Sequence, residues 1–247
     1  MARRAAAQAA GHPRPVSTAR ARAEWAARVR AEYRSAALAA RAFAEGVVCG
    51  LPRPVLDAAA RVAADELDHA ELSHAAWESL GGSGAALALE VGALLPAGGG
   101  AVHPLAALVD AAVQDFCVGE TLAVPLFAAM RGGATGTPRA VLDRILADEA
   151  RHRAFGWSLL DALLALDPPG VRARAADALP AALAGSRAAY GDLPVAAPLC
   201  PEEREAGLLE PAEYAEIWAA TVEGQLRPAF AARGIVAPAL PPQPRAR

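Results

Sequence analysis

Two short stretches of this sequence, Asp65–His69 (DELDH) and Asp148–His152 (DEARH), share the pattern D-E-x-x-H and decide how the rest is interpreted. On a helix, side chains three residues apart point to the same side, so the Glu and the His of each stretch can reach one metal ion. We therefore expect each stretch to lie on a helix and to contribute a Glu–His pair to a buried metal site.

The sequence around the two stretches predicts an all-α fold, because it is rich in Ala, Leu, Arg and Glu and poor in β-branched and aromatic residues. Apolar periodicity, Pro and Gly predict two helical hairpins joined by a long Gly-rich connection, which is the connectivity of a ferritin-like four-helix bundle with one long crossover. The expected helices cover about residues 18–44, 54–80, 104–130 and 137–167, with two further helices at 171–189 and 211–233. The expected regions are a disordered basic arm (1–17), the four-helix bundle (18–166), a C-terminal helical extension (167–233) and a disordered Pro-rich tail (234–247).

A two-metal site in such a bundle also requires one Glu from each of the other two helices. In an antiparallel hairpin, residues at one height are about equally far from the turn. Glu32 lies about as many residues before the Cys49-Gly50 turn as Glu66 lies after it. Glu120 and Glu149 are related in the same way by the turn at 132–136. The predicted set of metal ligands is therefore four Glu and two His, namely Glu32, Glu66, His69, Glu120, Glu149 and His152. Hard oxygen ligands combined with imidazole suit a pair of iron or manganese ions.

These six residues resemble the ligand set of the ferritin-like di-iron carboxylate superfamily, over roughly residues 18–166. The second stretch is similar to the D-E-x-R-H variant of bacterial multicomponent monooxygenases. The resemblance implies that Asp65 holds the imidazole of His152, that Asp148 holds that of His69, and that Arg151 neutralises a buried Asp. Such outer carboxylates fix the imidazole orientation and strengthen its donation to a metal. The first stretch departs from the variant, with Asp68 at the position of the Arg.

The composition excludes several classes of protein. The net charge of −3 gives no electrostatic reason to expect nucleic-acid binding. Three widely spaced cysteines without a CxxC pair argue against a disulfide framework and against a rubredoxin-like iron site. The uncharged stretch at 91–109 contains Pro and Gly and favours a loop over a membrane span. A cytoplasmic protein is expected, in which metal rather than arginine balances the buried carboxylates.

The resemblance implies a non-haem di-iron oxidase or oxygenase that uses O2 to hydroxylate, N-oxygenate or desaturate a small organic substrate. Its cofactor would be two Fe ions, with Mn or a mixed Mn/Fe pair as alternatives. Electrons would come from an external ferredoxin or reductase, and the C-terminal helices could cover the bundle or form a homodimer contact. Alternatives are an iron-handling ferroxidase or peroxidase of the rubrerythrin/ferritin type, a tRNA hydroxylase, and a metal-free bundle that acts as a scaffold.

Overall fold

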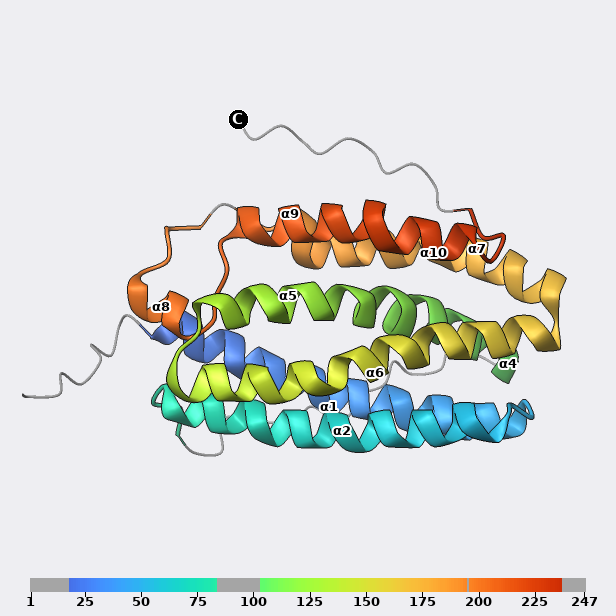
Figure 1. Ribbon diagram of the computed structural model, residues 1–247, viewed down its shortest axis with the longest axis horizontal. Helices are drawn as coiled ribbons and strands as arrows, with labels where there is room; N and C mark the ends of the chain where they lie inside the picture. Colours follow the sequence, from blue (N-terminus) through green and yellow to red (C-terminus); the bar gives the residue numbers. More distant parts are fainter. Residues whose placement is uncertain (1–17, 84–102, 195, 237–247) are drawn as a thin grey trace, which may run out of the picture.

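The computed structural model describes residues 18–83, 103–194 and 196–236, and within these ranges the chain is all-helical, without a strand. The predicted arm (1–17), most of the tail (237–247) and most of the Gly-rich connection (84–102) lie outside the described residues. Four long helical segments form two antiparallel hairpins, and a C-terminal group of helices packs onto the second of them (Figure 1).

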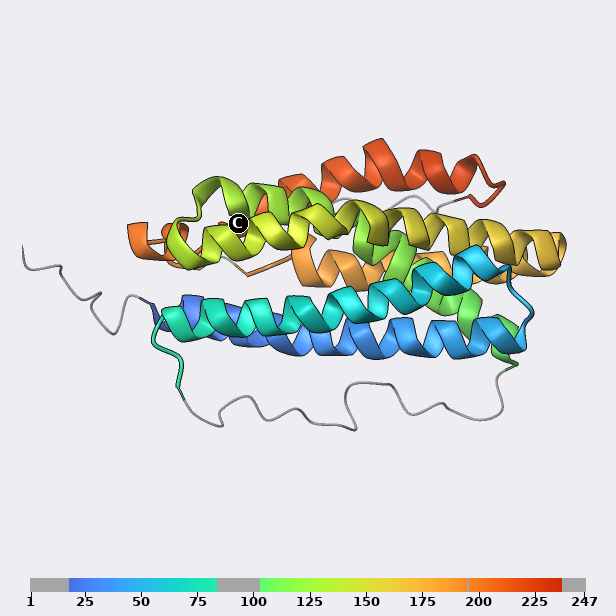
Figure 2. The same ribbon diagram turned by 60° about the horizontal axis from the view of Figure 1, so that its bottom comes forward.

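The first hairpin consists of α1 (Ala19–Val48) and α2 (Arg53–Ser79), which lie side by side along their length (Figure 2). Helix α1 runs about four residues past its expected end, because Gly46 is still helical and packs under Leu51 and Leu56. The chain turns at Gly50, whose φ of +71° is the left-handed conformation that glycine adopts without strain. The short turn keeps the two helices in register, so residues equally distant from it lie at the same height.

The second hairpin departs from the expected continuous helix at 104–130. It begins with α4 (Pro104–Ala111), widens into a π-helical segment η1 (Ala112–Gly119), continues as α5 (Glu120–Gly133), and returns through α6 (Gly136–Leu166). Apolar periodicity alone does not distinguish π from α over two turns. Segments of π-helix inside α-helices are rare and are often found at functional sites. This one ends directly at Glu120, one of the predicted ligands.

The C-terminal extension is more divided than the two expected helices. It contains α7 (Pro168–Ser186), η2 (Arg187–Gly191), α8 (Pro201–Glu205), α9 (Pro211–Thr221), η3 (Val222–Leu226) and α10 (Arg227–Ala231). Helix α7 packs on η1 and α4, and α9 packs on α5. The extension also reaches α1, where the indole Nε1 of Trp25 donates a hydrogen bond of 2.9 Å to the carbonyl of Ala206. It is thus part of one continuous core with the two hairpins.

Among the described residues, one segment is long and apolar enough to span a membrane, namely Pro104–Gly133. Half of its most apolar window is buried inside the protein. Packing against α6 and α7 accounts for this burial, and core helices of soluble proteins are commonly as long and as apolar.

Gly156 allows α6 to approach η1 at the level of the site. A Cβ atom there would lie 2.5 Å from the backbone oxygen of Phe116, a contact that only a backbone shift relieves. We expect Gly156→Ala to destabilise the fold by about 1–3 kcal/mol, as overpacking of a core does. Urea unfolding followed by circular dichroism measures the effect.

The matched control for Gly156→Ala is Gly185→Ala on α7, where an added Cβ would meet nothing within 4 Å. Because Ala is favoured over Gly inside helices, this variant should gain about 0.5–1 kcal/mol. Equal stability changes in the two variants would contradict the close approach of α6 and η1.

Candidate metal centre

The six predicted ligands come from four helical segments and are all buried, with exposed fractions of 8% or less. Each interrupts the apolar stripe of its helix: Glu32 follows Trp25 and Val29 on α1, and Glu149 follows Ile145 on α6. Burying a carboxylate among apolar groups is costly unless it is paired or binds a metal ion. The burial of four glutamates together therefore requires a compensating charge, whether protons or cations.

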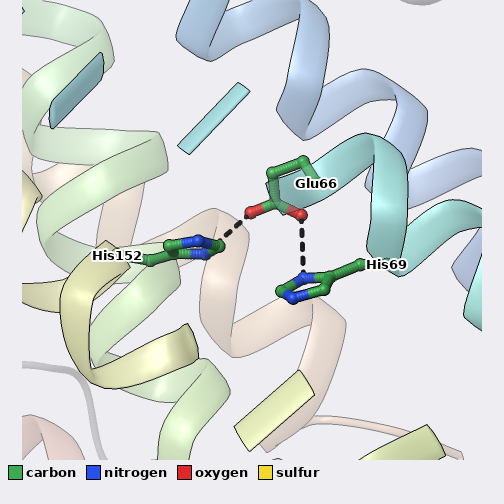
Figure 3. A group of neighbouring side chains, drawn as sticks. All are labelled: Glu66, His69 and His152. Atoms are coloured by element: carbon green, nitrogen blue, oxygen red, sulfur yellow. Dashed lines mark ion pairs between the residues drawn. The ribbon is translucent and has the colours of Figure 1, made fainter. Parts of the chain in front are cut away.

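The two imidazoles face the same carboxylate. Figure 3 shows Glu66 between His69 and His152: its Oε1 lies 3.1 Å from Nδ1 of His152, and its Oε2 lies 3.5 Å from Nδ1 of His69. The ring centroids are 5.3 Å apart. Both Nδ1 atoms thus point inward, toward the space between the helices.

The opposite nitrogen of each ring points to an aspartate on the other motif. Nε2 of His69 lies 3.3 Å from Oδ2 of Asp148, and Nε2 of His152 lies 3.4 Å from Oδ2 of Asp65. This is the crossed arrangement that the family resemblance implies. When the Nε2–H group of a neutral imidazole donates to an aspartate, the lone pair on Nδ1 remains free to bind a metal ion. The imidazoles are therefore oriented by residues of α2 and α6 before any metal is bound.

Three arginines hold the two aspartates. The sequence analysis predicted this role only for Arg151. Arg151 contacts both Asp65, at 3.1 Å, and Asp148. Arg61 lies 2.9 Å from Asp65, and Arg144 contacts Asp148; each arginine stands four residues before its aspartate. Both motifs are thus R-x-x-x-D-E-x-x-H, a repeat that was visible in the sequence. The expectation that metal rather than arginine balances the buried carboxylates is wrong for these two aspartates, which arginine side chains reach from the surface.

The four glutamates, in contrast, lack such arginine partners among the described residues. Burial, together with Glu66, holds the pKa of Glu32 well above its usual range, and burial raises the pKa of Glu120 to about 8. Burial and the neighbouring Glu120 likewise raise the pKa of Glu149. Glu66 differs: burial opposes its ionisation, but the two imidazoles outweigh this effect and bring its pKa to about 2.

Some of the donor atoms lie close enough together to hold a metal ion. There are two groups of candidate ligand atoms, and within each group all atoms lie within 4.8 Å of one another. The first group comes from Glu66, His69 and His152, and the second from Glu120, Glu149 and His152. Glu32 belongs to neither group but lies beside Glu66. Five buried atoms of these residues have no hydrogen-bond partner in the described part of the chain: Glu32 Oε1, Glu66 Oε2, His69 Nδ1, Glu149 Oε2 and His152 Nδ1. Cations bound between the helices would satisfy all of them.

The raised carboxyl pKa values predict how metal affinity depends on pH. Protons on Glu32, Glu120 and Glu149 must leave before these groups bind a cation, so binding releases protons. The apparent affinity for Mn²⁺ should therefore increase from pH 6 to about pH 8, where Glu120 titrates in the metal-free protein. Calorimetric titration in buffers of different ionisation enthalpy measures the released protons. Glu120→Gln should release fewer protons at pH 7, and an affinity independent of pH would contradict the crowded carboxylate cluster.

A cavity of about 460 Å³ leads to this cluster. It lies between α1 and α5, which make few backbone contacts with each other, and residues of the C-terminal extension, among them Tyr190 and Tyr214, line it as well. All four glutamates line it. The size falls within the range of about 300–1,000 Å³ that is typical of small-molecule sites. The sequence analysis did not predict that the C-terminal extension lines the cavity, because α9 and η2 carry no motif that indicates a site.

The arrangement thus places buried carboxylate and imidazole groups that could hold a metal ion beside a cavity of small-molecule size, with each imidazole oriented by an aspartate. Comparison of the chain with protein-family models, with curated proteins and with solved structures found no match, so the functional argument rests on these residues and their geometry.

Proposed function

We propose that this protein is a non-haem di-metal oxidase or oxygenase of the ferritin-like type that oxidises a small organic substrate. One observation carries the proposal: two R-x-x-x-D-E-x-x-H motifs face each other across α2 and α6, with both Nδ1 atoms directed toward buried glutamates and without a hydrogen bond to a described residue. The order of the two hairpins and the position of the π-helical segment before Glu120 support the same class.

The residues Glu32, Glu66, His69, Glu120, Glu149 and His152 would hold the metal ions. Carboxylate and imidazole ligands suit iron or manganese, with two iron ions as the expected pair. When bound, such a pair supplies the electrons and the coordination positions for reaction with O2.

The chain's own residues have separable tasks in this proposal. Asp65 and Asp148 keep the proton of each imidazole on Nε2, and Arg61, Arg144 and Arg151 hold the two aspartates in place through ion pairs. Phe116 and Leu126 line the cavity and limit the access of water to the glutamates. The described residues contain no disulfide and no second metal cluster, and the electrons would come from a separate reductase or ferredoxin.

The cavity favours an organic substrate over iron storage, because its Phe127, Met130 and Leu126 side chains offer apolar surface. The test is anaerobic loading with Fe²⁺ followed by a pulse of O2. An oxygenase consumes O2 in proportion to an organic substrate and inserts or removes atoms in that substrate, detected by mass spectrometry with ¹⁸O2. Continued oxidation of added Fe²⁺ without need of a substrate would instead identify an iron-handling protein, and no reaction of the loaded protein with O2 would refute both.

A further inference from the structure

The cavity contains a positive group that the metal centre does not use. Arg28 is half-buried on α1, one helical turn before Glu32, and lines the same cavity as the four glutamates. One turn corresponds to a rise of about 6 Å along the helix. A ligand that contacts Arg28 would therefore extend naturally toward the glutamates.

Arg28 forms no salt bridge with a carboxylate of the described residues, although its charge lowers the pKa of Glu32 and so opposes part of the effect of burial there. Its guanidinium lies 4.5 Å from the ring centroid of Phe127 and 5.3 Å from that of Trp25, and its Nη2 lies 3.2 Å from the sulfur of Met130. The other arginine that lines the cavity, Arg34, faces Asp115 at 3.8 Å. A guanidinium offers five N–H donors in a fork that matches a carboxylate, and a thioether sulfur is only a weak acceptor. The donors of Arg28 therefore remain available for an anion.

Two tyrosines of the C-terminal extension line the cavity as well. The rings of Tyr190 and Tyr214 are stacked, with centroids 6.1 Å apart, and neither hydroxyl forms a hydrogen bond with a described residue. Burial raises the pKa of Tyr190 and brings that of Tyr214 to about 12, while Arg28 is near enough to oppose both shifts in part. Both phenols therefore remain protonated and can donate to a bound anion.

The charge of the cavity follows from the proposed function, on which this inference rests. Four ionised glutamates carry a charge of −4, and two divalent ions carry +4, so the loaded metal centre is neutral. Glu24 and Asp115 also line the cavity and equal Arg28 and Arg34 in number, but only Arg34 forms a salt bridge with one of them, Asp115. The reason to expect an anionic ligand is therefore local: the guanidinium donors of Arg28 face the cavity without a salt bridge to a described carboxylate.

We propose that the cavity binds a small organic carboxylate, with its carboxylate group on Arg28, Tyr190 and Tyr214 and its apolar portion directed past Phe127 toward the glutamates. The substrate class is then an aryl or alkyl carboxylic acid, and oxidation occurs at a carbon remote from the carboxylate. Arg28 is a binding residue that fixes which end of the substrate meets the metal centre.

The test is calorimetric binding to Mn²⁺-loaded protein without O2, with the metal content of each sample measured beforehand. The ligands are benzoate, phenylacetate, 3-phenylpropionate and octanoate, with phenylacetamide and phenethylamine as neutral and cationic counterparts of phenylacetate. The variants are Arg28→Met, which keeps the apolar stem, Arg28→Lys, and Tyr214→Phe. Arg30→Met is the matched control, because Arg30 is exposed on α1 and does not line the cavity.

We expect at least one carboxylate to bind, and its neutral counterpart to bind about 10–100-fold more weakly, as the loss of charged hydrogen bonds predicts. Arg28→Met should weaken the carboxylate by a similar factor, Arg28→Lys and Tyr214→Phe by less, and Arg30→Met should bind as the wild type does. The proposal is overturned if no carboxylate binds, if phenethylamine binds more tightly than phenylacetate, or if Arg28→Met keeps the wild-type affinity. Absence of bound metal in these samples would instead refute the proposed function. Carboxylate binding that depends on Arg28 can be measured in metal-free samples as well, so the two proposals can fail separately.

Discussion

Replacement of Glu66 by Ala or Gln should leave the purified protein with essentially no bound metal. Glu66 is nearer to both imidazoles than Glu149 is, at 3.1 Å from His152 and 3.5 Å from His69, against 4.0 and 3.8 Å for Glu149. Its removal takes a negatively charged ligand from the centre of the site and leaves both Nδ1 atoms without an anionic neighbour at that distance. Metal analysis by mass spectrometry after equilibration with Fe²⁺ or Mn²⁺ measures the loss.

The control for Glu66 is Asp68→Ala, a change inside the same motif at an exposed position. This variant should bind the same amount of metal as the wild type. Glu66→Gln preserves the volume of the side chain, so a folded but metal-free Glu66→Gln variant separates ligand loss from misfolding. Full metal occupancy in Glu66→Gln would show that the ligand assignment is wrong.

The second large effect is expected for the two aspartates behind the imidazoles. Asp65→Asn and Asp148→Asn should each reduce metal affinity by about 10–100-fold, as loss of the group that orients a ligating histidine does. Asn can still accept a hydrogen bond, but it lacks the charge that strengthens donation by the ring and that pairs with the arginines. Competition with a chelator of known affinity measures the change.

The two substitutions should have similar effects, because each aspartate contacts the histidine of the other motif and is flanked by an arginine four residues earlier. Asp143→Asn is the control, since Asp143 is an exposed residue of α6 that pairs with Arg131 and Arg139 on the surface. A loss of affinity in Asp143→Asn equal to that in Asp65→Asn would mean that charge, rather than the crossed contacts, controls the metal site.

Much of the candidate site could be predicted from the sequence, because helical geometry is regular. A spacing of three residues places Glu66 and His69 on one face, and a short turn fixes which residue of the partner helix lies at the same height. Glu32 and Glu120 were selected in this way, and the structure brings both to the cavity that Glu66 and Glu149 line. These predictions needed only a constant rise per residue and two recognisable turns.

The remaining features depend on tertiary packing that no local pattern encodes. The π-helical segment before Glu120 packs against α6 and α7, and no pattern in its own residues distinguishes it from an α-helix. The cavity exists because α1 and α5 diverge and the C-terminal extension closes the gap with Tyr190 and Tyr214. Arg61 and Arg144 were different, since their shared position four residues before each aspartate was visible but was not recognised as part of the motif.

The central claim is that one chain holds two metal ions in adjacent sites built from both motifs. The most direct measurement is the stoichiometry of Mn²⁺ bound to the wild-type protein, combined with its electron paramagnetic resonance spectrum. The account predicts two ions per chain with the exchange-coupled spectrum of a neighbouring pair. A single ion per chain, or two ions with the spectrum of isolated Mn²⁺, would contradict it.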